Sequence, residues 1–155
     1  MTVKDMAKLC AATEADLDAL IALAEVMHDE SPRFRVYAFM PDRLRVALTT
    51  VMRTHLGCAF VVEQDGQITG GFAAIAHPHF ACNVLQACDV GLFISPEHRG
   101  GTAAARLIHA YLNWARSIEA EPTISINTGV EVERTGQLFQ ALGAKQSGFN
   151  WTWGI

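Results

Sequence analysis

The sequence has little of what marks a membrane, secreted or nucleic-acid-binding protein. Only 18% of its residues are charged, and 12 basic against 16 acidic side chains give a net charge of −4. A general nucleic-acid binder carries a basic face, so this balance argues against such a partner. No apolar run approaches the roughly 20 residues of a membrane span. Residues 1–5, MTVKD, also lack the apolar core of a signal peptide.

Cysteine is scarce and irregularly spaced. The four cysteines lack the paired spacing of a disulfide framework and stand at Cys10, Cys58, Cys82 and Cys88. Free thiols fit a reducing compartment, which predicts a cytoplasmic protein. His77 and His79 lie near Cys82 in the sequence, but a metal site requires a closed ligand set with recognisable spacing. We therefore expect no bound metal.

The chain contains no internal repeat, low-complexity tract or linker rich in proline, glycine and serine. Its 155 residues suggest one domain, residues 1–155. Half of them are apolar, which argues against disorder. A chain of this size buries roughly 68–70% of its unfolded surface, so its core needs neither disulfides nor metal.

Hydrophobic spacing and turn residues predict an alternation of strands and helices. Helices are expected over residues 14–28, 41–54, 102–118 and 131–142, and strands over 3–10, 58–63, 68–76, 84–94, 123–128 and 147–153. Asp65-Gly66 is a strong hairpin signal between two of these strands. Gly143 is a helix C-cap, and Gly91 suggests a bulge or a close backbone approach within its strand. The order predicts an α/β (α+β) fold, a mixed sheet with helices on it.

The most informative turn joins strand 84–94 to the following helix. A helix N-terminus offers free N–H groups and a partial positive charge. The glycines and alanines of residues 100–104 leave those amides uncovered, so a phosphate can approach the backbone. Arg99 adds a forked donor for phosphate oxygens. A flexible helix start without a ligand remains the alternative, whereas a dinucleotide-binding turn is disfavoured because Gly-x-Gly-x-x-Gly is absent.

Residues 94–104, ISPEHRGGTAA, resemble the acyl-CoA-binding motif of GNAT N-acetyltransferases. That motif is commonly written Gln/Arg-x-x-Gly-x-Gly/Ala and stands here as Arg99-x-x-Thr102-x-Ala104. Residues 137–144, QLFQALGA, resemble the family's final helix with its Leu-Tyr-x-x-Leu-Gly-Phe pattern. The Asp-Gly hairpin followed by Ile68–Phe72 resembles its central strands. The resemblance covers residues 60–145 and implies a single-domain GNAT-like acyl-CoA N-acyltransferase fold, with a mostly antiparallel sheet flanked by helices.

The resemblance implies acetyl-CoA as cosubstrate, with its pantetheine in a gap between strands 84–94 and 123–128. The pantetheine amides would pair with the backbone like an added strand, and the pyrophosphate would rest on the amides of the turn. Asn127 would approach the pantetheine or the acceptor. The implied cofactor-binding residues are Leu92, Phe93, Ile94, Arg99, Gly100, Gly101, Thr102, Ala103, Ala104, Asn127 and Phe139.

Two motif positions depart from the family. Thr102 replaces the first glycine, so a Cβ reduces the room at the backbone. Phe139 replaces the tyrosine often assigned as general acid, and phenylalanine donates no proton. A thiol with a pKa near ~8.5 leaves reasonably well as thiolate. An active enzyme therefore either dispenses with a tyrosine acid or takes one from elsewhere, and Tyr37 is the candidate.

Acyl transfer to an amine requires a base, because a free amine with a pKa near ~10.4 is mostly protonated at neutral pH. Asp89 is the only acid in strand 84–94, and burial would raise its pKa toward the working range. We take Asp89 as the candidate catalytic residue, as base or amine anchor, with a purely structural role as the alternative.

The predicted function is direct transfer of an acetyl group from acetyl-CoA to a primary amine, on a small molecule or a peptide. A non-catalytic acyl-CoA-binding module is the alternative, and a structural protein is a third class. Asp29 and Glu30 would attract a cationic amine, unless they belong to a solvated loop. Trp151 and Trp153 share one face of the expected last strand, as core or as the surface of a homodimer.

Overall fold

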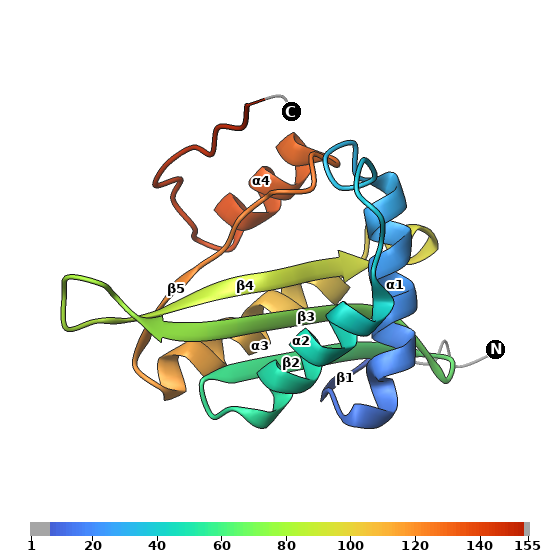
Figure 1. Ribbon diagram of the computed structural model, residues 1–155, viewed down its shortest axis with the longest axis horizontal. Helices are drawn as coiled ribbons and strands as arrows, with labels where there is room; N and C mark the ends of the chain where they lie inside the picture. Colours follow the sequence, from blue (N-terminus) through green and yellow to red (C-terminus); the bar gives the residue numbers. More distant parts are fainter. Residues whose placement is uncertain (1–6, 154–155) are drawn as a thin grey trace.

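The computed structural model of the chain contains a mixed sheet of five strands. Its long strands lie side by side across the middle of Figure 1. Residues 7–153 are described. The strands follow the order β1 (Lys8–Ala11), β2 (Gly57–Gln64), β3 (Gln67–Pro78), β4 (Leu85–Ile94) and β5 (Ala120–Thr123). Strands β1 to β4 pair antiparallel, and β5 pairs parallel to β4. The prediction of a mixed, mostly antiparallel sheet is confirmed.

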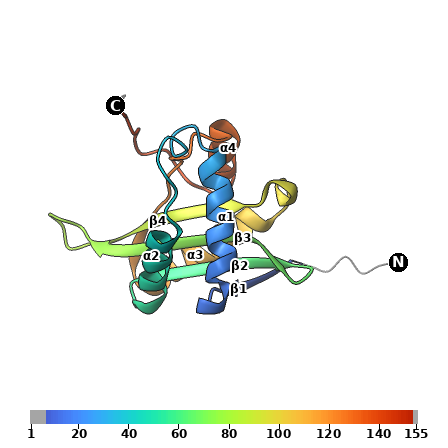
Figure 2. The same cartoon turned by 45° about the vertical axis from the view of Figure 1, so that its right-hand side comes forward.

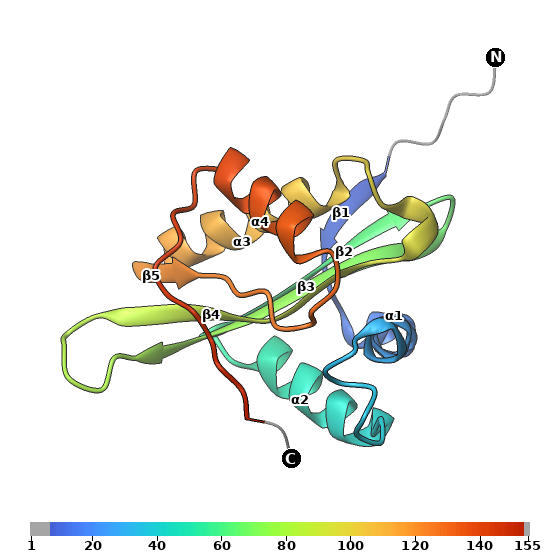
Figure 3. The same ribbon diagram turned by 90° about the horizontal axis from the view of Figure 1, so that it is seen from above.

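Helices cover both faces of this sheet. Helices α1 (Leu17–Glu30) and α2 (Pro41–Arg53) lie on one face, and α3 (Ala103–Ser117) and α4 (Val132–Ala141) on the other (Figure 3). Figure 2 shows α1 crossing in front of the strands. Because side chains of a strand alternate between faces, two cores form. One contains Leu17, Ile21, Leu48, Val51, Ala59 and Ala73; the other is centred on Val62, Phe72, Leu107 and Tyr111.

Local signals in the sequence set several boundaries. Asp65 and Gly66 have φ values of 53° and 75° in the β2–β3 hairpin, as a two-residue turn with two positive φ angles requires. Helix α4 ends at Ala141 and its C-cap is Leu142; Gly143, the next residue, has the left-handed φ of 93° that commonly ends a helix, so the cap lies one residue before the glycine expected to form it. Within residues 7–153, no helix is both long enough and apolar enough to cross a membrane.

Two expected strands are wrong. Pairing of β5 with β4 ends at Thr123, so residues 124–128 are not a strand. The backbone N–H of Ser125 donates to the side chain of Asp89. It is therefore not available for the next backbone hydrogen bond between β5 and β4. Residues 144–153 also form no strand, because they find no neighbouring strand despite their β-favouring aromatics. Of the expected strand 3–10, residues 8–10 lie in β1 and residues 3–6 lie outside the described residues.

A bulge in β4 lies beside the point where β4 and the chain after β5 separate. Ala73 pairs with Gly91 and Ala74 with Asp89, so Val90 is the extra residue. Such a bulge bends its strand and disrupts the ladder locally. The bulge that Gly91 suggested is therefore present, and it lies next to the last β4–β5 pair, Cys88 with Thr123.

Candidate functional site

A cavity of about 440 Å³ opens where β4 and residues 124–128 separate. This volume falls within the range of small-molecule sites, roughly 300–1,000 Å³. We call it the main cavity. Its walls come from the end of α1, the free edge of β4, the turn before α3, residues 125–130 and the first part of α4. Segments far apart in the sequence therefore meet around one space.

Most of the predicted site residues line this cavity. They are Asp89, Leu92, Phe93, Ile94, Arg99, Gly100, Gly101, Ala103, Ala104 and Asn127. Thr102 and Phe139 are not part of the lining, and Leu138 takes the place expected for its neighbour Phe139. The roles of all these residues stay predictions, since their placement alone assigns no contact with a ligand.

The turn before α3 presents backbone to the cavity. Gly100 has φ 88°, a left-handed conformation that a side chain would strain. A Cβ added at Gly101 would meet nothing within 4 Å. Helix α3 begins at Ala103, and its first N–H groups have no partner within the helix. The turn thus has the open backbone and the helix terminus that suit an anion.

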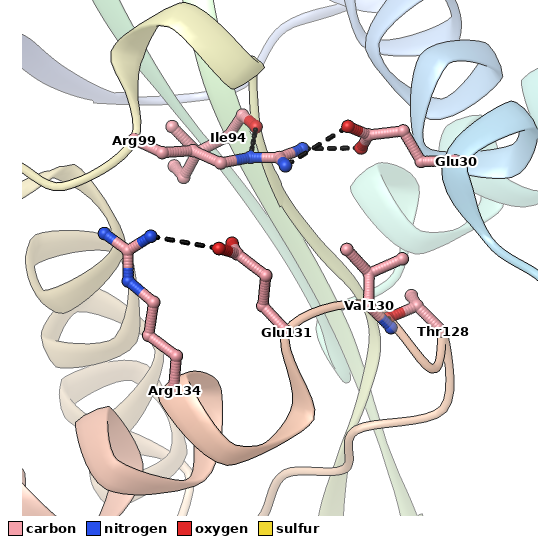
Figure 4. Close-up of polar contacts among 7 residues, drawn as sticks. All are labelled: Glu30, Ile94, Arg99, Thr128, Val130, Glu131 and Arg134. Atoms are coloured by element: carbon pink, nitrogen blue, oxygen red, sulfur yellow. Dashed lines mark hydrogen bonds and ion pairs between the residues drawn. The ribbon is translucent and has the colours of Figure 1, made fainter.

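We predicted that the guanidinium of Arg99 is free to donate to phosphate, but in the structure most of its N–H groups are bound to other residues. Its Nη1 and Nη2 donate to the two carboxylate oxygens of Glu30 at 3.2 and 2.6 Å, and its Nε donates to the carbonyl of Ile94 at 3.0 Å (Figure 4). The guanidinium also lies 5.1 Å from the centre of the Phe93 ring. The fork therefore fastens the turn to the end of α1, and only two of its five N–H donors remain.

A second arginine, Arg134 of α4, also lines the cavity and was missed by the sequence analysis. Its Nη1 donates to Glu131 at 3.0 Å (Figure 4). Its Nη2 lies 3.4 Å from where a Cβ on Gly100 would stand. Its side chain is 59% exposed, against 23% for Arg99. The sequence did contain a hint of this role. A cation in the first turn of a helix is unfavourable because it opposes the helix dipole, so an arginine at this position suggests that it binds an anion.

Asp89 lies at the closed end of the gap and is tied to the opposite wall. Its Oδ1 accepts from the backbone N–H of Ser125 at 2.9 Å and from the Ser125 hydroxyl at 3.1 Å. Burial raises the pKa of Asp89 above its ordinary value, and the bonds from Ser125 partly oppose that rise. Asn127 extends the network by donating to Ser125 Oγ at 2.8 Å.

The end of α1 fastens to both walls of the cavity. Ser31, fully buried, donates from Oγ to the carbonyl of Thr128 at 2.5 Å. Arg33 lies 3.3 Å from the carbonyl of Asn127, while Glu30 holds Arg99. Phe34 lines the cavity from this side. Residues 30–34 therefore bridge the phosphate-side turn and the 125–128 wall.

No tyrosine lines the main cavity. Tyr37 is 57% exposed and stands outside the lining. Tyr111 is buried, and its hydroxyl lies 2.9 Å from the carbonyl of Ala87 and 2.7 Å from that of Thr123. That hydroxyl joins β4 to β5 at their paired ends, and burial raises its pKa. A tyrosine acid therefore has no candidate within the described lining.

Comparisons with known proteins agree with this architecture. The model of the Acetyltransferase (GNAT) family matches residues 22–144. A search of curated proteins finds no significant match. Similar solved structures include a predicted acetyltransferase with acetyl-CoA from Clostridium acetobutylicum, 12% identical, covering 96% of each chain, with TM-score 0.74. Another is AAC(6')-Iy in complex with the bisubstrate analogue CoA-S-monomethyl-acetylneamine, 17% identical, covering 96% of this chain and 97% of that one, with TM-score 0.72.

An aminoglycoside acetyltransferase from an uncultured soil metagenomic sample is 16% identical, covering 96% of this chain and 98% of that one, with TM-score 0.70. At these low sequence identities, the three structures show only that the fold is shared. The family model, in contrast, matches the sequence itself over most of the chain, from within α1 to just beyond the end of α4. The chain belongs to the GNAT acetyltransferase family.

Proposed function

We propose that this protein transfers the acetyl group of acetyl-CoA directly to a primary amine. The family's cosubstrate is acetyl-CoA. The observation that carries the proposal is the main cavity, which runs from the open backbone of residues 100–104 to Asp89 beside the β4 bulge. One end suits the phosphates of a nucleotide thioester, and the other holds a carboxyl group that would accept a proton from the amine. Two solved structures of the same fold contain acetyl-CoA or a CoA bisubstrate analogue.

The donor would lie along the free edge of β4. Beyond Cys88, no strand formed by residues 7–153 pairs with β4 on the side of the main cavity, so the backbone at Leu92 and Phe93 is available to pantetheine amides. The carbonyl of Ile94 already accepts from Arg99. The phosphates would rest on the amides at the start of α3, with the guanidinium of Arg134 beside them.

The acceptor amine, protonated at neutral pH, loses one proton before it attacks and a second as the amide forms. The amine nitrogen attacks the thioester carbon, the C–N bond forms, and the C–S bond breaks to release the CoA thiolate. Asp89 would take the first of these protons, directly or through water, since its raised pKa makes its carboxylate a better base. The second would pass to the released thiolate or to water. The thiolate would leave without a tyrosine acid, as thiols are acidic enough for this.

A non-catalytic acyl-CoA-binding module stays the second candidate, favoured by Phe139 at the family's tyrosine position. Measuring thiol release from acetyl-CoA with a panel of amines separates the two. Amine-dependent release supports the transferase. Binding of CoA by calorimetry without any release supports the binding module, and absence of binding contradicts both.

We further propose that residues 1–155 form one domain of a cytoplasmic protein that pairs with a second copy through its C-terminal segment. Phe149, Trp151 and Trp153 are 75%, 80% and 85% exposed in the single chain. Three large apolar side chains within five residues favour a partner surface. Sedimentation of the parent protein and of Trp151→Ser tests this: a dimer that the substitution dissociates supports pairing, and a parent monomer contradicts it.

A further inference from the structure

A second, smaller cavity of about 90 Å³ lies between the α1–α2 layer and the sheet. We call it the apolar cavity. Its lining contains no charged or hydrogen-bonding side chain and consists of Leu20, Leu23, Ala24, Met27, Leu44, Leu48, Ala59, Gly71, Phe72, Ala73, Val90, Gly91, Leu92 and Phe93. Met27 and residues 90–93 also line the main cavity. The two cavities therefore adjoin along β4, next to the bulge.

Gly91 lies where the cavities adjoin. A Cβ built there would have no neighbour within 4 Å, and the φ of Gly91 lies outside the left-handed region. Neither the backbone nor a close contact requires glycine at this position. Its cross-strand partner Ala73, another small residue, lines the apolar cavity. Small residues on the two strands thus leave open space beside the proposed reaction centre.

Asp29 and Glu30, the acidic residues that we expected to attract a cationic amine, do not line the apolar cavity. Glu30 is engaged by Arg99, and the side chain of Asp29 is 76% exposed. Neither residue belongs to the lining of the apolar cavity. A cationic group placed in it would find no carboxylate, and burying an unpaired charge is strongly unfavourable. The cavity therefore selects against a polycationic acceptor.

We infer that the apolar cavity holds an uncharged alkyl group of the acceptor amine, an assignment that rests on the proposed function. Acetyl-CoA would fill the main cavity from the turn to Asp89, so the second reactant needs another approach to the thioester. The adjoining cavity on the α1–α2 side provides that space. An apolar cavity of about 150 Å³ binds benzene, which has six carbons, so about 90 Å³ suits a shorter chain of about three or four carbons.

The direct test compares amines that differ only in the part expected to enter the cavity. From ethylamine to pentylamine, kcat/KM for acetylation should rise about fourfold for each buried methylene group. The compound 1,5-diaminopentane has the length of pentylamine but carries a second ammonium, and its kcat/KM should be about 100-fold lower. Equal values for these two amines would overturn the assignment.

Two variants fill the cavity from different strands. Ala73→Leu and Gly91→Leu should each lower the ratio of kcat/KM for pentylamine to that for ethylamine by about tenfold, because the added side chain occupies the alkyl group's space. Gly148→Leu is the matched control, since a Cβ there also meets nothing within 4 Å but Gly148 lines neither cavity. An unchanged ratio in both cavity variants would contradict the proposal.

The acyl chain of the donor is the competing source of an alkyl group. If hexanoyl-CoA is preferred over acetyl-CoA with ethylamine, and Ala73→Leu abolishes that preference, the cavity serves the acyl chain and the assignment to the amine is wrong. Calorimetric titration of pentylamine into the CoA-bound protein gives a readout without turnover. Binding that Ala73→Leu weakens would support the cavity even if no acetyl transfer occurs, whereas absence of binding would overturn it.

Discussion

The guanidinium of Arg99 and the carboxylate of Glu30, which both line the main cavity, form a two-pronged ion pair at 3.2 and 2.6 Å. Arg99 follows β4 and precedes α3, whereas Glu30 is the last residue of α1. The pair therefore joins the two layers of helices around the sheet. Both side chains are largely shielded from solvent, so their attraction is less screened than that of a surface pair.

We expect Arg99 and Glu30 to be energetically coupled. Arg99→Ala and Glu30→Ala should each reduce the free energy of unfolding, and the double variant should lose less than the sum, with a coupling of about 1–2 kcal/mol. Urea unfolding of the four proteins measures this coupling. Arg99→Lys keeps the charge but not the fork and should recover only part of the stability. Strictly additive losses would show that the pair contributes nothing as a unit.

Coenzyme A affinity should depend on Arg134 more than on Arg99. Arg134 is the more exposed arginine and makes one hydrogen bond, to Glu131, so its remaining donors are available to phosphate. Arg134→Ala should raise the Kd for coenzyme A by about 10- to 150-fold, the loss of one charged hydrogen bond. Arg99→Ala should weaken binding by a smaller factor. Calorimetry at fixed ionic strength gives both values.

Controls for Arg134 separate a phosphate contact from a structural effect. Arg116 on α3 bonds to Asn113 and lies outside the main cavity, so Arg116→Ala should leave the Kd unchanged. S-acetylpantetheine lacks phosphates, and its affinity should be the same for Arg134→Ala and the parent. A parallel loss with S-acetylpantetheine would assign Arg134 to structure.

The sequence predicted the features that depend on short-range rules. Periodicity located the four helices and the central strands, and the Asp65-Gly66 turn joined β2 to β3 as expected. The turn at residues 99–104 was found because glycine and alanine before a helix have a direct consequence for backbone access. Ten of the predicted site residues consequently meet around one cavity.

Features that depend on long-range contacts were not predictable in this way. Nothing local to Arg99 reveals that Glu30, 69 positions away, takes its fork. The end of β5 depends on a hydrogen bond from the backbone N–H of Ser125 to the carboxylate of Asp89, which interrupts a ladder that the pattern of residues 123–128 would continue. The expected last strand failed because alternation specifies a strand's faces but supplies no partner.

Phe139→Tyr should not raise kcat. Phe139 is buried and is not part of the main cavity's lining, so a hydroxyl added there is not placed to protonate the leaving thiolate. An unsatisfied buried hydroxyl should lower the free energy of unfolding by about 1–3 kcal/mol. Steady-state kinetics and urea unfolding give the two quantities. Phe80→Tyr, at an exposed site that lines neither cavity, should alter neither; a several-fold rise in kcat for Phe139→Tyr would restore the tyrosine acid.

Asp89 should govern both the rate and its pH dependence. As base, it is active when ionised, so kcat/KM should rise with pH through its raised pKa. Asp89→Asn should lower kcat/KM by roughly 10²–10⁴-fold and remove this rise. Ser125→Ala removes a hydrogen bond that lowers the pKa of Asp89, so it should shift the rise to higher pH. Equal activity of Asp89→Asn and the parent from about pH 6 to 9 would assign Asp89 to structure, since an ordinary catalytic base titrates within reach of that range.

The same shift has a consequence for stability. The folded protein holds the Asp89 proton to higher pH than the unfolded chain, whose carboxyl titrates near 3.8. The unfolded state therefore binds fewer protons in that interval, and the free energy of unfolding should fall as pH rises from 3.8 through the folded pKa. Asp89→Asn lacks this titration, so its unfolding free energy should lose that slope in urea titrations across the acidic range. A steeper fall in the variant than in the parent would show that burial does not dominate at Asp89, and that its bonds to Ser125 hold the ionised form instead.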